Sequence, residues 1–167
     1  MDVGLLILRT VFGLLLAAHG LQKLFGWFGG AGVGGTATFF ESLRFHPGRV
    51  VVVAAALGEC GGGLLLALGL FQPAAPAPLI SVMIVAIATV HWGHGLLAPD
   101  GIEHPVLYLT AAFSLALTGP GAYSLDAVLG FTHWWTPQLI AIALGAGVLG
   151  GLVSLGFRRA GTEVAHA

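Results

Sequence analysis

Ionisable residues lie inside the long apolar runs of this chain. Arg9 lies in the first run, Glu59 in the second, and His91 and His94 in the third, while His19 lies near the end of the first. In a lipid-embedded helix such a residue costs from about 2.5 kcal/mol upward and normally faces the protein interior with a partner. Carboxylate and imidazole groups held there could accept and transfer protons. The candidate catalytic residues are therefore Arg9, His19, Glu59 and His91.

The apolar runs that must position these residues have the length of membrane-spanning helices. Of the 167 residues, 57% are hydrophobic and 8% are charged, whereas soluble domains have roughly 25% charged residues. A hydrocarbon core about 30 Å thick needs about 20 apolar residues in a helix. Runs that meet or approach this length cover residues 3–21, 50–71, 76–97, 105–118 and 137–157. We predict an all-α, polytopic transmembrane bundle, with four core helices and a fifth C-terminal helix in a single membrane domain over residues 1–167.

The positive charges of the predicted loops fall on one side of this bundle. They belong to Lys23, Arg44, Arg49, Arg158 and Arg159. Cytoplasmic loops carry an excess of Lys and Arg. We therefore expect a multi-pass protein of the bacterial cytoplasmic (inner) membrane, with these loops in the cytoplasm and lipid around the helices.

A glycine-rich segment follows the first run. Glycines recur between Gly26 and Gly35, and "TATFFESLRF" comes next. Unpaired backbone amides are not tolerated in lipid, so the segment should be re-entrant or interfacial. The alternation of Phe with polar residues then predicts a short amphipathic helix in the interface, with Thr36 as its N-cap. This part is either a linker that anchors the bundle or a functional flap across its mouth.

The depths of the charged residues predict which of them meet. Counted at 1.5 Å per residue from the cytoplasmic helix ends, Arg9 and Glu59 lie within one helical turn of each other in depth. We expect them to form an ion pair in the dry interior, with His19, His91 and His94 gathered in the leaflet half below. In the alternative interpretation, the ion pair only fixes the helix register and the histidines only join helices by hydrogen bonds.

The residues around this polar file are candidates for holding a cofactor. Lys23 follows His19 by four residues and so shares its helix face at the interface. Glycines next to Glu59 could let a flat ligand lie against that helix. The candidate cofactor-binding residues are His19, Lys23, Gly62, Gly63, His91 and His94.

Metal, haem and nucleotide sites are less well supported by the sequence. His91 and His94 could share a metal ion, but no cysteine cluster or Glu-x-x-His repeat completes a site, so we predict no metal. A haem held by His19 and His91 stays an alternative. The single cysteine, Cys60, excludes an intramolecular disulfide. No phosphate-binding loop, dinucleotide fingerprint or basic nucleic-acid patch is present in the sequence.

Several segments, in this order, resemble the DoxX family of small bacterial membrane proteins. They are "LRTVFGLLLAAHGLQKLFGWFGGAGVGGTATFFESL", "ALGECGGGLLLALGLF", "MIVAIATVHWGHG", "GIEHPVLYL" and "LTGPGAYSLD". The resemblance covers a core of about residues 5–126 and implies a four-helix membrane protein linked to redox metabolism. Relatives include the quinone-reducing membrane subunit of an archaeal thiosulfate:quinone oxidoreductase. A mycobacterial member assembles with a superoxide dismutase and a sulfurtransferase. The helix at 137–157 lies outside the usual family core.

Two functional hypotheses follow. In the first, the chain is a quinone-interacting subunit of an oxidoreductase complex and receives electrons from a partner redox protein. His19 or His91 would then donate to a quinone carbonyl, Glu59 would relay a proton, and Arg9 would hold Glu59 ionised. In the second, the chain is a non-enzymatic scaffold or assembly factor that recruits soluble redox enzymes to the membrane. A second copy of the chain is a further partner to consider under either hypothesis.

Overall fold

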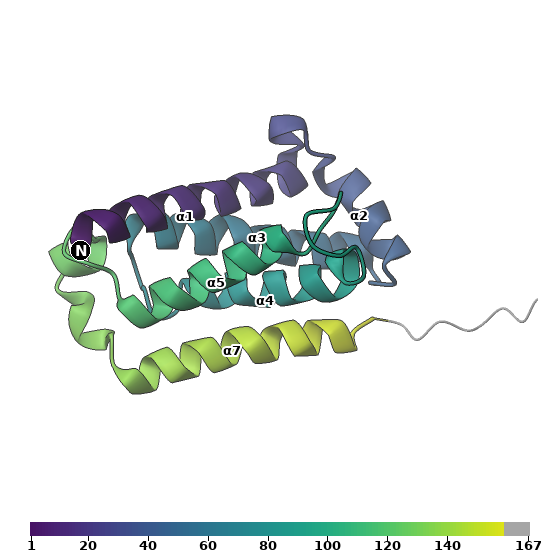
Figure 1. Ribbon diagram of the computed structural model, residues 1–167. Helices are drawn as coiled ribbons and strands as arrows, with labels where there is room; N and C mark the ends of the chain where they lie inside the picture. The colour runs from purple at the N-terminus through teal and green to yellow at the C-terminus, as the bar shows by residue number, and fades with distance from the viewer. Residues whose placement is uncertain (159–167) are drawn as a thin grey trace, which may run out of the picture.

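The computed structural model describes residues 1–158, which form a bundle of helices (Figure 1). Within these residues there is no strand, and the β-type pairing is one isolated bridge between Phe45 and Arg158. The prediction of an all-α helix bundle is confirmed. In chain order the elements are α1 (Asp2–Phe25), η1 (Trp27–Gly29), α2 (Gly32–Ser42), α3 (Gly48–Leu68), α4 (Pro76–Ala86), η2 (Ile87–His91), α5 (Glu103–Thr118), α6 (Leu125–Val128), η3 (Phe131–Trp134) and α7 (Pro137–Gly156).

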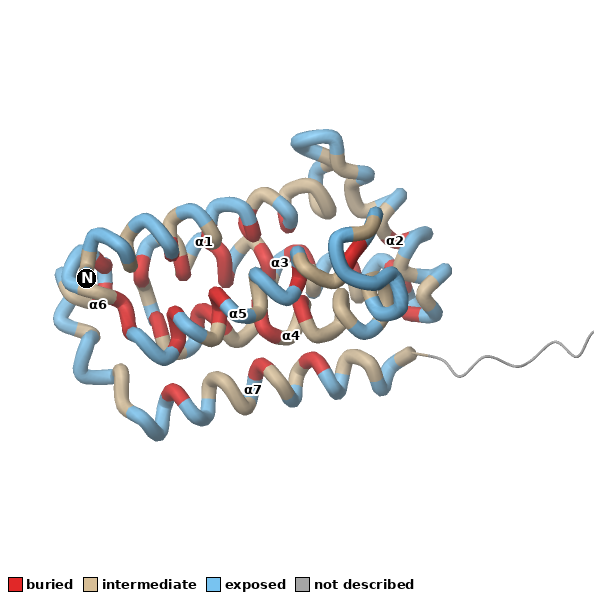
Figure 2. Tube along the Cα trace, viewed as in Figure 1, coloured by how far each residue is buried: buried red, intermediate tan, exposed pale blue. Residues whose placement is uncertain are grey.

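The outer surface of the bundle is apolar, as a lipid-facing surface should be. Among residues 1–158, the helices α1, α3 and α7 are long and apolar enough to cross a bilayer, and α4 with η2 forms a shorter apolar helix. Large apolar side chains such as Ile7, Leu57 and Ile142 are exposed along these helices. Buried residues instead follow the faces that the helices turn toward one another (Figure 2). This distribution matches a protein whose solvent is hydrocarbon.

Glycine and proline residues set the ends of the long helices. Gly26 ends α1 and Gly69 ends α3, each in the left-handed backbone region, with φ of 74° and 64°. Pro76 begins α4, and Pro137 begins α7 behind Thr136, whose hydroxyl accepts a hydrogen bond from the Leu139 amide at 3.2 Å. Proline at the first helical position is a usual start signal of a helix, and glycine just past the last position is a usual stop signal.

Glycines also let α1 and α3 pack in direct backbone contact. A Cβ atom added to Gly13 would lie 2.5 Å from the Gly63 carbonyl oxygen, and one added to Gly63 would lie 2.6 Å from the Gly13 carbonyl oxygen. A Cβ on Gly20 would similarly lie 2.6 Å from the Ala56 carbonyl oxygen. These contacts fix which residues of the two antiparallel helices face each other.

The C-terminal helix α7 packs mainly along α4 (Figure 1). Gly147 and Gly151 allow the approach, because a Cβ on either would lie within 3.0 Å of Ile80 or Ile84 side-chain atoms. The Ser81 hydroxyl also donates a hydrogen bond to the Gly147 carbonyl oxygen at 2.7 Å. The hydrophobic core lies between α1, α3, α4 and α5 and consists of Leu16, Leu66, Leu79, Ile80, Met83, Ala112 and Leu115.

Two predicted helix boundaries were wrong. The run that was expected to continue to residue 97 ends at His91, because Gly93 and Gly95 adopt left-handed φ values of 99° and 79° in the loop that follows. The interfacial helix begins at Gly32 instead of after Thr36. Glycine weakens a helix by about 1 kcal/mol, and the packing of α2 against α3 and α1 offsets that cost.

The glycine contact between α1 and α3 yields a stability prediction. Replacing Gly63 with Ala should lower the midpoint of thermal unfolding in detergent, because its Cβ meets the Gly13 backbone and overpacking costs about 1–3 kcal/mol. Gly61→Ala is the matched control, since a Cβ at Gly61 meets no atom within 4 Å. That variant should be as stable as the wild type or slightly more stable. Equal midpoints for the two variants would contradict this packing.

Candidate functional site

A buried ion pair joins α1 to α3. The Lys23 ammonium donates to Glu59 Oε2, and the Glu59 side chain is only 2% exposed while that of Lys23 is 23% exposed. Lys23 lies in the last turn of α1, and Glu59 lies in the middle of α3. A carboxylate in this position needs an opposite charge beside it. Lys23 provides that charge, so the prediction that Arg9 pairs with Glu59 is wrong.

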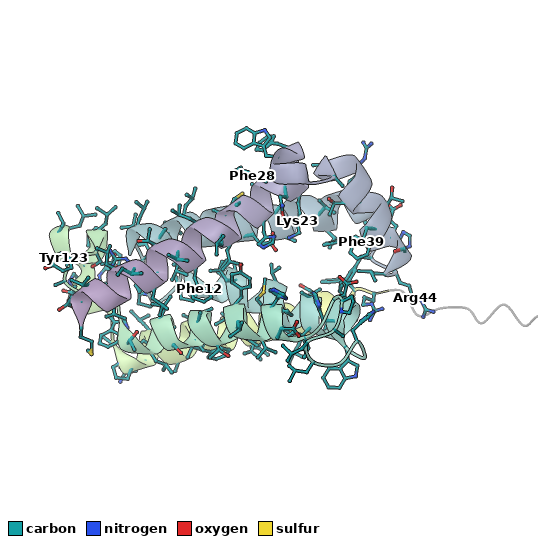
Figure 3. The ribbon with its side chains drawn as sticks, turned by 45° about the horizontal axis from the view of Figure 1, so that its top comes forward. Phe12, Lys23, Phe28, Phe39, Arg44 and Tyr123 are labelled. Atoms are coloured by element: carbon teal, nitrogen blue, oxygen red, sulfur yellow. The ribbon has the colours of Figure 1, made fainter. Side chains whose placement is uncertain are left out.

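Arg9 lies at the other end of the bundle. Its guanidinium donates to three backbone carbonyl oxygens: that of Ala67 from Nε at 3.3 Å, and those of Pro120 and Tyr123 from its two terminal nitrogens. The side chain is buried, as predicted, but it is 14 residues before Lys23 on α1, which is about 21 Å along the helix axis. Figure 3 shows Tyr123 beside the start of α1 and Lys23 near the other end of that helix.

The Arg9 end is a second, separate polar centre. Asp126 is buried there, and its carboxylate accepts hydrogen bonds from the Phe71 and Gln72 amides, each at 2.9 Å. Ser124 caps α6 by accepting from the Ala127 amide at 3.1 Å. This centre joins the start of α1, the α3–α4 turn and the segment after α5. The prediction placed all the buried polar residues in one group, but the structure has two separate groups. Arg9 belongs to the group that holds the loops in place.

The error in the predicted pairing came from the helix register. Arg9 faces Ala67, which follows Glu59 by eight residues on α3, or about 12 Å. The sequence prediction ended the first helix at residue 21, whereas α1 continues to Phe25. This extension carries Lys23 to the level from which its long side chain reaches Glu59.

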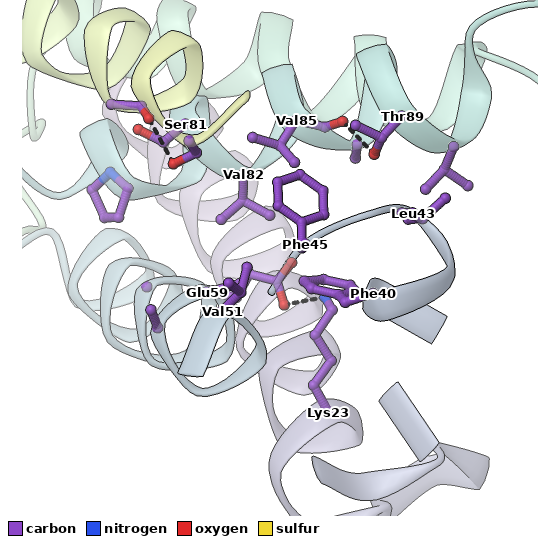
Figure 4. A pocket seen from close by; sticks show the side chains of 18 of the residues that line it. Lys23, Phe40, Leu43, Phe45, Val51, Glu59, Ser81, Val82, Val85 and Thr89 are labelled. Atoms are coloured by element: carbon purple, nitrogen blue, oxygen red, sulfur yellow. Dashed lines mark hydrogen bonds and ion pairs between the residues drawn. The ribbon is translucent and has the colours of Figure 1, made fainter. Parts of the chain in front are cut away.

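A cavity of about 480 Å³ opens beside the Lys23–Glu59 ion pair (Figure 4). Its wall is mostly apolar and includes the aromatic residues Phe39, Phe40 and Phe45 from α2 and the segment after it. The amphipathic helix, for which a linker and a flap were the two predicted roles, therefore lines a cavity. The wall also takes Leu43 from the segment after α2, and residues from α1, α3, α4, η2 and α7, which are Lys23, Val51, Ala54, Ala55, Gly58, Glu59, Pro78, Ser81, Val82, Val85, Ala86, Thr89, Val90, His91, Gly150 and Ser154.

Arg158, which follows α7, contacts two residues of the α2–α3 segment that line the cavity. The Arg158 guanidinium donates from Nε to the Leu43 carbonyl oxygen at 3.0 Å and lies 5.8 Å from the centre of the Phe45 ring. Phe45 is fully buried and packs against Phe40, with 5.9 Å between ring centres. The fifth helix contributes to the candidate site through Gly150 and Ser154, and Arg158 then joins the chain end beyond it to the α2–α3 segment. Arg159, whose charge was counted with that of Arg158, lies outside the described residues.

Of the predicted histidines, only His91 lines this cavity within residues 1–158. It ends η2, a π-helical turn in which the Trp92 amide donates to the Ile87 carbonyl oxygen at 2.8 Å. Single π-turns often occur at functional sites. His94 is exposed in the following loop, and His19 hydrogen-bonds Gln22 at 3.0 Å with its ring edge against Tyr108.

Gly62 and Gly63, which were predicted to bind a cofactor, are packed against neighbouring helices and do not face an open surface. Gly63 contacts the α1 backbone at Gly13 and Ala17, and Gly62 lies against Pro78 and the Ala75 carbonyl oxygen on the side of α4. No three His, Cys, Asp or Glu side chains of residues 1–158 cluster as metal ligands would.

Residues of α4 and η2 other than His91 contribute to the site without having been predicted. Ser81, Val85 and Thr89 lie four residues apart and line one side of the cavity. That spacing places residues on a single helix face, so it was a usable signal. The contribution of Gly150 and Ser154 had no comparable signal, because it depends on how α7 packs against α4.

The chain is similar to known proteins over the part that forms the cavity. The family model of DoxX matches residues 4–92, from α1 through η2. The chain belongs to the DoxX family. Apart from Gly150 and Ser154, every residue that lines the cavity falls within the DoxX match. The chain is also 34% identical over 127 residues to the Bacillus subtilis protein named "Putative oxidoreductase CatD", a match that covers 75% of this chain and 86% of that protein. No solved structure matches the chain.

The position of Arg9 yields a prediction that separates stability from binding. Arg9→Met should lower the free energy of unfolding by about 3 kcal/mol, because buried carbonyl oxygens lose a charged donor. Unfolding in detergent micelles by titration with a denaturing surfactant measures this change. Arg9→Lys should recover part of the loss, and ligand binding at the Lys23 end should be unchanged in the variants that fold. A stable Arg9→Met protein that has lost ligand binding would contradict the assignment.

Proposed function

We propose that this protein is a redox-associated subunit of a membrane oxidoreductase complex and that it binds a quinone ring in the cavity beside Lys23 and Glu59. The observation that carries the proposal is the combination, in one cavity, of a buried ion pair with an aromatic and aliphatic wall. Ligand sites have this character, in which a few polar groups orient a ligand that apolar side chains enclose. The oxidoreductase name of the similar Bacillus protein supports the redox assignment.

The residues present fit a quinone. The cavity volume of about 480 Å³ lies within the roughly 300–1,000 Å³ usual for small-molecule sites. Phe40 and Phe45 offer aromatic surface to a flat ring. Lys23 keeps N–H donors beyond the one that Glu59 accepts, so it can orient a ligand oxygen. A bound quinone would supply the capacity to take up two electrons and two protons.

The chain's own residues would bind this ligand and hold a proton. Glu59 is the buried carboxylate of the cavity wall within residues 1–158 and would hold the proton at a carboxylate oxygen. Lys23, and not Arg9, would stabilise the ionised carboxylate between transfers. The apolar wall would exclude water from the ring. Electrons would reach the site from a partner protein of the complex.

A scaffold role is the second candidate function, and the segment around η1 favours it. Phe25, Trp27 and Phe28 are each more than half exposed, and Figure 3 shows Phe28 at the outer edge of the bundle. Such a surface could hold a partner at the membrane interface. A protein that acts only in this way would carry no bound quinone.

The quinone proposal predicts a loss of bound ligand when the cavity is filled. Ala54 lines the cavity and Ala141 lies on the outer face of α7, and both are exposed. Ala54→Phe should reduce the quinone that co-purifies with the protein by about tenfold, because the ring occupies ligand space. Ala141→Phe should not change it. The measurement is quantitative mass spectrometry of quinone per protein after mild-detergent purification from a quinone-containing bacterial membrane.

Two results would count against this function. One is the absence of quinone from the wild-type protein, which would favour the scaffold role. The other is an equal amount of quinone in the Ala54→Phe and Ala141→Phe proteins, which would place the bound quinone elsewhere on the chain.

A further inference from the structure

The polar side chains in the cavity wall differ in what they can offer a ligand. Within the described part of the chain, the side chains with donor or acceptor atoms in the wall are those of Lys23, Glu59, Ser81, Thr89, His91 and Ser154. Which of these can donate and which can accept depends on the hydrogen bonds that each already makes inside the protein.

The hydroxyl groups of Ser81, Thr89 and Ser154 each donate their proton in a hydrogen bond within the protein. Ser81 donates to the Gly147 carbonyl oxygen at 2.7 Å, Thr89 to that of Val85 at 2.8 Å, and Ser154 to that of Gly150 at 2.7 Å. Figure 4 shows Ser81 and Thr89 at the cavity. A hydroxyl has one proton and two lone pairs, so each group can now only accept a hydrogen bond from a ligand.

His91 is also an acceptor when its ring is neutral. Its Nδ1 lies 2.8 Å from the Asp100 carbonyl oxygen. A carbonyl oxygen has no proton to give, so Nδ1 must carry the ring proton. The neutral imidazole then has a free lone pair at Nε2. The sequence predicted His19 or His91 as a donor to a quinone carbonyl, whereas this contact makes the neutral His91 ring an acceptor at Nε2.

The ion pair supplies the remaining groups. Glu59 is a carboxylate, and its second oxygen, Oε1, can only accept. Lys23 is therefore the one side-chain donor in the wall within residues 1–158. Five of the six polar side chains accept, and they come from α3, α4, η2 and α7, while the donor comes from α1.

We propose, on the basis of the proposed quinone site, that the cavity selects the reduced, dihydroxy form of its ligand over the oxidised, dione form. A hydroquinone has two O–H donors and its oxygens also accept, so it can donate into the acceptor-rich wall and still accept from Lys23. A quinone ring can only accept. A quinone accepts a hydrogen bond from Lys23, but its other oxygen then faces lone pairs of the wall. An unmade hydrogen bond in a buried site weakens binding.

The preference has a consequence for the redox reaction. A site that binds the reduced form about tenfold more tightly raises the two-electron potential of the bound couple by about 30 mV. The protein would thereby favour electron transfer to the ligand in the cavity. The role expected of this chain is then to accept electrons into the site and retain the reduced product.

The test compares the two oxidation states of one ring. Menadione and its hydroquinone, menadiol, differ only at their oxygens and have no long tail. Their dissociation constants for the full-length protein in lipid nanodiscs are measured anaerobically at pH 8, where an ordinary imidazole is neutral. We expect menadiol to bind about tenfold more tightly than menadione.

A matched pair of variants tests the cause of the preference. Thr89→Val removes one acceptor from the wall, and Thr118→Val removes the same type of hydroxyl from α5, where it donates to the Ser114 carbonyl oxygen at 2.8 Å away from the cavity. The preference for menadiol should fall about threefold in Thr89→Val and stay at the wild-type value in Thr118→Val.

Each outcome of this experiment is decisive. Equal binding of the two forms, or tighter binding of menadione, overturns this inference and leaves the proposed quinone site intact. Binding of neither form overturns the proposed site and the inference together. An unchanged menadiol preference in Thr89→Val shows that the wall acceptors do not cause it and likewise overturns the inference.

Discussion

The buried ion pair between Lys23 and Glu59 is the interaction on which the arrangement of this end of the bundle depends. Glu59 lies in the middle of an apolar helix and is almost fully buried. An uncompensated charge there would cost several kcal/mol. The end of α1 must therefore lie where the Lys23 ammonium reaches α3. The glycine contacts farther along the two helices hold the same register, so the ion pair and the helix packing agree.

The cavity beside this ion pair is formed by segments that come later in the chain, among them α2 and α7. After α1 the glycine-rich turn leads into α2, which crosses the end of the bundle and brings its aromatic residues beside Glu59. Helix α7 then closes the space from the other side, with Arg158 bonded to the α2–α3 segment at Leu43. Segments that are far apart in the sequence thus enclose the cavity beside the Lys23–Glu59 ion pair. The DoxX match covers most of this wall, and α7 adds the rest from outside the match.

The sequence was sufficient to predict the helices but not how they face each other. Long apolar runs bounded by Gly and Pro indicated the spans, and the burial of Arg9 and Glu59 was expected because a charge in lipid must turn inward. Their partners could not be found by counting depth. Partners depend on register, which backbone contacts at Gly13, Gly20 and Gly63 set to within a single residue.

Other features of the site were beyond sequence reasoning for similar reasons. The π-turn that ends at His91 inserts extra backbone into an ordinary helical pattern, and no residue type marks it. The acceptor role of His91 depends on a contact with the Asp100 backbone, to which any residue type could contribute. The tie between Arg158 and Leu43 is likewise a side-chain-to-backbone contact. Such contacts become visible only once the chain is folded.

A double-mutant cycle on the ion pair tests the account most directly. The free energies of unfolding in detergent micelles are measured for the wild type, Lys23→Met, Glu59→Gln and the double variant. If the two side chains meet in the interior, the effects of the single substitutions should be non-additive, with a coupling energy of about 2 kcal/mol or more. Additive effects, with a coupling energy near zero, would show that Lys23 and Glu59 do not interact and would contradict the site described above.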